Sequence, residues 1–93
     1  MRIDKFLKLS RLVKRRALAR EMAEVGAVRL NGAAVKPSAE VKPSDLIEIA
    51  FPSRVVSAEV ISSDEREIKR GKTPVRITGD RRLDRDEHPW QTG

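Results

Sequence analysis

The amino-acid sequence predicts an α+β domain in which two N-terminal amphipathic helices pack on a small, mostly antiparallel sheet, followed by a charged C-terminal tail. Three observations predict this class. Apolar residues recur at helical spacing in residues 1–25, polar and apolar residues alternate between turn residues in 28–61, and this periodicity fades beyond residue 62. A chain of 93 residues is long enough for one small domain.

The first helix is expected close to the N-terminus. On a helical wheel that turns about 100° per residue, one side is apolar apart from a serine and the opposite side is charged. The apolar side holds Ile3, Phe6, Leu7 and Ser10, and the charged side holds Asp4, Lys5 and Lys8. We therefore predict an amphipathic helix with a basic outer face.

A second amphipathic helix is predicted from Arg16, and Gly26 fits its C-terminus because glycine adopts the backbone conformation that ends many helices. Its apolar face is expected to hold Leu18, Met22 and Val25. The opposite face is expected to carry a basic ridge formed by the i,i+4 pair Arg16 and Arg20. The apolar stripe drifts between the two segments and leaves Leu12 off the buried side. This drift predicts a bend near Arg11–Lys14.

Short strands are expected after the helices. Asn31-Gly32 tolerates the positive φ angles of a type I′ turn, so residues 28–30 and 33–35 are predicted to form a hairpin. Two further strands are predicted at Leu46–Phe51, with Ile47, Ile49 and Phe51 on one face, and at Arg54–Ile61, with Val56, Ala58 and Val60 on one face.

The C-terminal third is expected to lie outside this domain. The sequence predicts a domain of residues 1–62 and a charged, flexible tail of residues 63–93, in which the apolar residues are isolated. Ser62–Glu65 can cap a short helix through Lys69, which Pro74 prevents from continuing.

Positive charge is concentrated in the N-terminal third. Residues 1–36 hold ten Lys and Arg against three acids, whereas residues 37–93 hold ten against eleven. Such a one-sided distribution is typical of a protein that binds a polyanion, either nucleic acid or an anionic membrane surface. The only aromatic residues are Phe6, Phe51 and Trp90, which disfavours base stacking and favours recognition of phosphates and shape.

The basic residues of the two helices are the candidate binding residues. Lys5 or Lys8 taken alone is an ordinary solvent-facing residue, but Lys14, Arg15 and Arg16 are contiguous, and their mutual repulsion indicates a partner that relieves it. Asp4 has two interpretations. It either pairs with one of the arginines and holds it in place, or complements the dipole of the first helical turn.

Residues for catalysis or metal binding are scarce. The chain has no cysteine, and its one histidine, His88, lies in the expected tail, where we interpret it as solvated. Asp84–Glu87 reads as a solvated charge run, and Gly71-Lys72-Thr73 lacks the upstream glycine of a phosphate loop. We therefore expect a non-enzymatic protein without a cofactor. No apolar run reaches membrane-spanning length, so we expect a cytoplasmic protein without a membrane partner.

The order of these segments resembles the S-four RNA-binding domain family. The resemblance is carried by the stretches "RIDKFLKLSRLVKRRALAREM", "GAVRLNG" and "VKPSDLIEI", which lie in this order within residues 2–51. It implies that the two helices form the alpha-L motif of that family and bind RNA. Ala17, where a hydroxyl residue is common, and Ser44, where glycine is common, depart from the pattern.

Among stand-alone S-four proteins, the opening stretch is most similar to the RqcP (YabO) family of bacterial ribosome-associated quality control. This similarity implies a factor, monomeric when free, that binds rRNA and peptidyl-tRNA on obstructed large ribosomal subunits and supports alanine tailing of stalled chains with an RqcH-type partner. Two alternatives remain: a recycling factor similar to the heat-shock-protein-fifteen family, and a basic module that binds proteins or membrane surfaces. Together, the basic face and the resemblance give these candidate RNA-binding residues: Arg2, Asp4, Lys5, Lys8, Arg11, Lys14, Arg15, Arg16 and Arg20.

Overall fold

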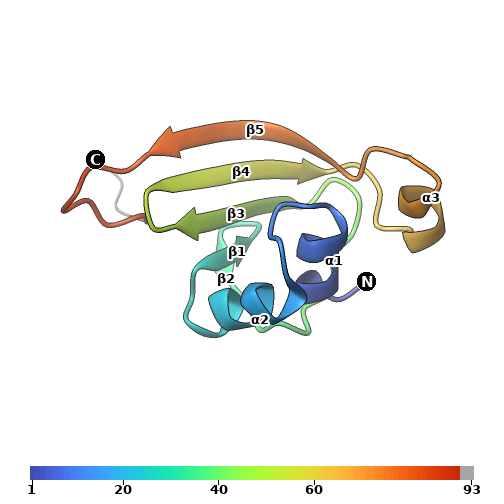
Figure 1. Ribbon diagram of the computed structural model, residues 1–93, viewed down its shortest axis with the longest axis horizontal. Coiled ribbons are helices and arrows are strands. Elements are labelled where there is room, and N and C mark those ends of the chain that lie inside the picture. Colours follow the sequence, from blue (N-terminus) through green and yellow to red (C-terminus); the bar gives the residue numbers. More distant parts are fainter. Residues whose placement is uncertain (91–93) are drawn as a thin grey trace.

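The computed structural model describes residues 1–90 of the chain (Figure 1). These residues form three helices and one antiparallel sheet. In chain order the elements are α1 (Ile3–Leu9), α2 (Arg16–Glu24), β1 (Val28–Leu30), β2 (Ala33–Ala34), β3 (Leu46–Phe51), β4 (Arg54–Val60), α3 (Glu65–Lys69) and β5 (Val75–Arg82). The prediction of an α+β fold with two N-terminal helices on a small antiparallel sheet is confirmed.

Within residues 1–90 the sheet has five strands in the order β2-β1-β3-β4-β5. Every neighbouring pair is antiparallel. The helices α1 and α2 lie together beside β1–β3, whereas α3 lies at one end of the long β4 and β5 strands (Figure 1). This arrangement places α1 near the same end of the sheet as α3 (Figure 1).

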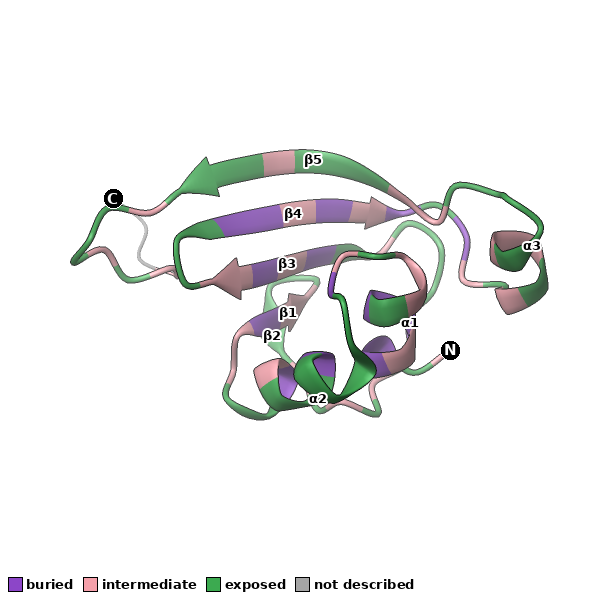
Figure 2. Ribbon diagram, in the orientation of Figure 1, coloured by how far each residue is buried: buried purple, intermediate pink, exposed green. Residues whose placement is uncertain are grey.

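The core is formed between α1, α2 and the sheet. Figure 2 shows buried residues along β3 and β4 and within both N-terminal helices. The largest fully buried side chains are Phe6, Ile3, Leu7, Ile47, Ile49, Val28, Val41 and Val60. The apolar side predicted for the first helix is therefore correct for its three large residues, and so are the inward positions Ile47 and Ile49 of β3. Asp4, however, was placed on the charged outer side and is buried instead.

The predicted apolar face of α2 is wrong. Leu18 is 44% exposed and Val25 is 79% exposed, whereas Ala19 and Ala23 are buried. These two alanines are four residues apart and so share one face of the helix. Their small side chains allow the helix backbone to approach the core closely, and this turns the larger apolar residues outward. Only Met22 of the predicted set packs against the core, and it does so partly buried.

The predicted turns are confirmed by the backbone. Gly26 has φ +79° at the end of α2, and Arg11 has φ +66° in the bend between α1 and α2. Asn31 and Gly32 both have positive φ, as a type I′ hairpin requires. Asn31 also joins the hairpin to β3, because its Oδ1 accepts a hydrogen bond from the amide of Leu46 at 2.9 Å.

The expectation of a flexible tail after residue 62 is wrong for α3 (Glu65–Lys69) and β5 (Val75–Arg82), which are regular elements of the fold. The capping interpretation of the sequence is confirmed, since Asp64 Oδ1 accepts a hydrogen bond from the Glu67 amide at 3.1 Å. β5 pairs with β4 from Val60 opposite Val75 to Arg54 opposite Arg82. Most side chains of β5 are exposed, so this strand is held by backbone pairing with β4. Its sequence therefore lacks the apolar alternation from which a strand is predicted. The division of the chain at residue 62 stays a prediction.

Trp90, close to the C-terminal end of the described residues, contacts the start of the sheet. The Trp90 indole Nε1 donates a hydrogen bond to the Gly26 carbonyl at 3.2 Å, and the Arg29 guanidinium lies 4.4 Å from the centre of the Trp90 ring. These contacts place the last described residues beside the start of β1. Residues 91–93, the end of the expected tail, lie outside the described residues.

Candidate nucleic-acid interface

The loop between α1 and α2 places three contiguous basic residues on the outside of the molecule. The positive φ of Arg11 reverses the chain after α1, and the Val13 amide donates to the Leu7 carbonyl at 3.0 Å. Val13 itself is buried and anchors the loop. Lys14, Arg15 and Arg16 follow and are all exposed. The basic run singled out in the sequence is therefore accessible to a partner.

Asp4 connects the first turns of α1 and α2. Asp4 is only 2% exposed. Its carboxylate accepts hydrogen bonds from Arg2 Nη2 at 3.3 Å and from Arg16 Nη2 at 3.4 Å. It lies in the first turn of α1, where its charge also complements the helix dipole. Both interpretations of Asp4 therefore hold. Because one buried carboxylate contacts both guanidinium groups, it orients them relative to each other.

A shallow groove of about 610 Å³ lies over this cluster. It is lined by Arg2, Asp4, Arg16, Ala17, Arg20, Glu21 and Glu24. Arg20 donates through Nε to Glu24 at 3.0 Å, an i,i+4 pair. Acids and arginines balance here, so the groove offers oriented guanidinium groups and not a large net charge. A guanidinium has five N–H donors, so its remaining donors are available to phosphate oxygens.

Lys5 is bound to the C-terminal helix. Its Nζ lies 2.6 Å from Glu65 Oε1, and the second oxygen of Glu65 lies 2.8 Å from Lys69 Nζ. Hydrogen bonds from Lys5 and then Lys69 stabilise the carboxylate and lower the pKa of Glu65 from 4.5 to about 2. Lys5 is thus partly neutralised, and it links α1 to α3.

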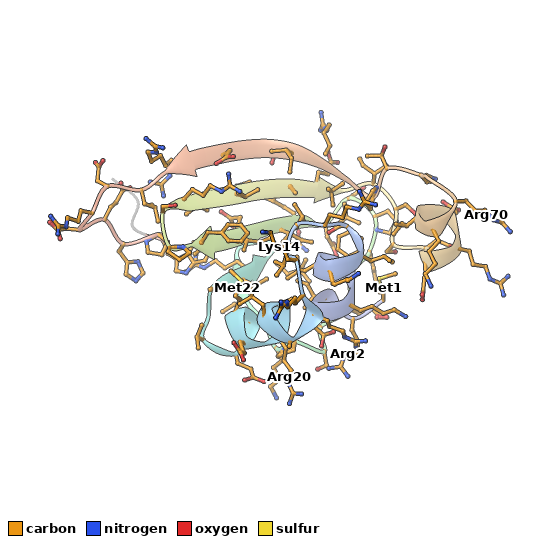
Figure 3. The ribbon with its side chains drawn as sticks, in the orientation of Figure 1. Met1, Arg2, Lys14, Arg20, Met22 and Arg70 are labelled. Carbon is orange, nitrogen blue, oxygen red and sulfur yellow. The ribbon has the colours of Figure 1, made fainter. Side chains whose placement is uncertain are left out.

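The remaining basic candidates are free of such pairs. Within residues 1–90, none of these side chains takes part in an ion pair: Lys8, Arg11, Lys14 and Arg15. All four are exposed. In Figure 3, Lys14 lies at the loop, while Arg2 and Arg20 extend from the far side of the helix pair. The candidate residues therefore surround α1 and α2 and do not form one cluster.

The sequence did not identify Glu65, Lys69 and Lys72 as neighbours of α1. Lys8 and Arg11 line a groove together with Lys69 and Lys72. The local signals were present, because Asp64 caps α3 and Glu65 and Lys69 are spaced i,i+4. The contact between Lys5 and Glu65 spans 60 residues and depends on where β4 ends, which no local pattern reports.

The part of the chain that the structure describes was compared with three other kinds of site: a metal centre, a membrane-spanning helix and a second cavity. No group of three or more His, Asp or Glu side chains within residues 1–90 is placed to hold a metal ion. Across the same residues, no helix is both long and apolar enough to span a membrane. A larger cavity, of about 880 Å³, lies away from the N-terminal helices and mixes Arg29 and Arg81 with acids such as Glu48 and Glu87. Its mixed charge does not favour a polyanion.

Comparison with known proteins is consistent with this surface. Residues 1–47 match the family described as S4 domain. The chain is 48% identical over 60 residues to the RQC P-site tRNA stabilizing factor of Bacillus subtilis, covering 64% of this chain and 70% of that protein. It is 42% identical over 73 residues to the protein of the same name in Listeria monocytogenes, covering 78% and 79%.

A solved structure shares the fold. The trimeric structure of Vibrio cholerae heat shock protein 15 superposes with a TM-score of 0.72 at 29% sequence identity, covering 84% of this chain and 81% of that chain. The match extends well beyond residues 1–47, so the similarity includes strands of the sheet as well as the two helices.

Proposed function

Because the chain belongs to the S4 domain family, as a relative of the RQC P-site tRNA stabilizing factors, we propose that it binds rRNA and peptidyl-tRNA on obstructed large ribosomal subunits. In this role it supports alanine tailing of stalled nascent chains together with an RqcH-type partner. It acts in the cytoplasm, is monomeric when free, needs no cofactor and performs no chemical step of its own.

The observation that carries this proposal is the shared hydrogen bonding of Arg2 and Arg16 to the buried Asp4. Both arginines are about half exposed, so they present N–H groups to a partner while the carboxylate holds them from behind. Planar guanidinium groups match phosphate oxygens in pairs. A preformed pair of this kind supports docking on an RNA backbone at low entropic cost.

The unpaired cations supply a second contribution. Lys8, Arg11, Lys14 and Arg15 form no ion pair with a carboxylate within residues 1–90. Their neutralisation by phosphates releases counterions, which makes binding strong and salt-dependent. A small domain that steadies tRNA against rRNA needs only such contacts and a rigid frame.

The test is co-sedimentation of the protein with large subunits that carry peptidyl-tRNA, with RNase-treated and empty subunits as controls. The wild-type protein should sediment with the obstructed subunits, and Arg16→Ala should sediment less. Arg82→Ala, which removes an exposed arginine at the end of β5, is the matched control. Equal sedimentation of the Arg16 and Arg82 variants would refute the proposal.

A second candidate function is favoured by the similarity to heat shock protein 15. A recycling factor of that type would act on the same obstructed particle without supporting alanine tailing. Mass spectrometry of nascent chains from cells that lack this protein distinguishes the two functions. Loss of C-terminal alanine tails supports the first function, whereas unchanged tails with accumulated obstructed subunits support the second.

A further inference from the structure

A groove of about 500 Å³ separates the end of α1 from the segment that joins α3 to β5. It brings together residues that are more than 55 positions apart in the sequence. Its cationic side chains are Lys8 and Arg11 on one side, and Lys69 and Lys72 on the other. Among residues 1–90, no carboxylate lines it. We call it the Lys8–Lys72 groove.

Several contacts fix the C-terminal wall of this groove. The Lys5–Glu65 ion pair joins α3 to α1, and Ile68 of α3 packs against the core. At the other end of the segment, the Ile61 amide donates to the Pro74 carbonyl at 2.7 Å. The lysines on α3 and the following loop are therefore carried on an ordered support.

Positive charge prevails around the groove. Two acids, Glu65 and Glu67, pair with the lysines of the groove and bind Lys69 at 2.8 Å and Lys72 at 2.8 Å, respectively. Together with Lys5, the five cations exceed these two carboxylates by three charges. Arg70 adds a further exposed cation directly after α3, at the outer edge of the molecule (Figure 3).

We propose that the Lys8–Lys72 groove is a second phosphate-binding surface, which extends the RNA interface from α1 and α2 to α3. The inference rests on the proposed function. Its occupant is the sugar–phosphate backbone of an RNA strand, because Arg11 belongs both to this groove and to the loop that carries Lys14 and Arg15. A single RNA backbone that contacts the loop therefore meets the groove without a break in positive charge.

The experiment measures the dissociation constant for obstructed large subunits at several salt concentrations. The double variant Lys69→Ala with Lys72→Ala should reduce the slope of log affinity against log salt by about two, since each phosphate contact contributes about one. The ratio of wild-type affinity to variant affinity should therefore increase about tenfold when the salt concentration falls from about 200 to about 50 mM. Lys69→Arg with Lys72→Arg should restore the wild-type slope.

The matched control is Arg82→Ala with Arg85→Ala, which removes the same charge at the far end of β5. Circular dichroism confirms that each variant is folded. If the Lys69 and Lys72 variant binds like this control while Arg16→Ala binds weakly, the groove proposal is overturned and the proposed function stands. If Arg16→Ala also binds normally, both fall. If the double variant loses affinity for a purified protein partner but not for subunits, the occupant is an acidic protein and the proposal is overturned.

Discussion

Arg16 and Asp4 form a hydrogen-bonded ion pair between the first turns of α2 and α1, with Nη2 and Oδ1 3.4 Å apart. Asp4 is buried and Arg16 is about half exposed, so the pair joins the interior to the surface. Arg2 meets the other carboxylate oxygen at 3.3 Å. Removal of either partner therefore affects both the helix pair and the surface that it presents.

Arg16→Ala should weaken binding to obstructed subunits and reduce the salt slope by about one. Because Arg16 is half exposed and Asp4 keeps Arg2 as a partner, the free energy of unfolding should fall by only about 0.5–1 kcal/mol. Chemical denaturation measures the second effect and subunit binding the first. A loss of binding no greater than that of Arg82→Ala would contradict the prediction.

Asp4→Asn separates orientation from charge. The substitution keeps the shape of the side chain but weakens its bonds to both arginines, so stability should fall by about 1–3 kcal/mol. A protein with one more net positive charge would bind RNA more tightly if charge alone mattered. We expect weaker binding to obstructed subunits together with unchanged or tighter binding to bulk RNA. Tighter binding to both the obstructed subunits and bulk RNA would show that Asp4 does not position the arginines.

The ion pairs of Glu65 make stability depend on acidity. The folded-state pKa lies near 2, below the ordinary value of 4.5, so the stabilisation is present above pH 4.5 and is lost as pH falls toward 2. The difference in melting temperature between the wild type and Glu65→Gln should shrink over this range. Glu21→Gln, an exposed acid outside the ion pairs of residues 1–90, should show no such convergence. A constant difference from pH 6 to pH 2 would exclude the pair as a stabilising contact.

Gly32→Val should destabilise the domain by about 1–2 kcal/mol, since Gly32 has φ +86° and a β-branched residue disfavours positive φ. A Cβ at this position meets no atom of residues 1–90 within 4 Å apart from its chain neighbours, so the cost arises in the backbone. Ala34→Val on the exposed strand β2 is the control and should be neutral. Thermal denaturation of both variants tests the assignment, and equal melting temperatures would contradict it.

A chain of residues 1–62 is predicted to fold on its own. All buried residues of the core cluster lie between Ile3 and Val60. The truncation removes β5 and the partly buried Ile68 and Val75, so its melting temperature should be lower than that of the whole chain. Circular dichroism on heating measures the transition. Absence of a cooperative transition would show that the domain requires its C-terminal third.

Much of the fold could be predicted because local patterns determine it. The spacing of Ile3, Phe6 and Leu7 identified the inward side of α1, and Asn31-Gly32 identified the hairpin. The face of α2 could not be predicted in the same way. A hydrophobic wheel gives most weight to large residues, whereas close packing of the helix selects the small Ala19 and Ala23.

The arrangement of the candidate site could be predicted only in part, for a similar reason. The basic residues are identified by type, and the structure adds which of them share a carboxylate. Asp4 buried between Arg2 and Arg16 follows from the turn at Arg11, which brings the two helix starts together. The position of Lys69 and Lys72 beside Lys8 and Arg11 could not be predicted, because it depends on strand pairing across β4 and β5, a long-range relationship without local periodicity.

The pairing of β5 with β4 also affects how the protein behaves at high concentration. An uncovered edge strand offers free amides and carbonyls to another molecule and promotes aggregation, and charged side chains along the edge oppose such contacts. Here β5 forms one edge, with exposed Arg76, Arg81 and Arg82, and a bulge interrupts its pairing near Ser57. The other edge, β2, is only two residues long. The charged C-terminal strand thus shields the apolar β4 from intermolecular sheet growth.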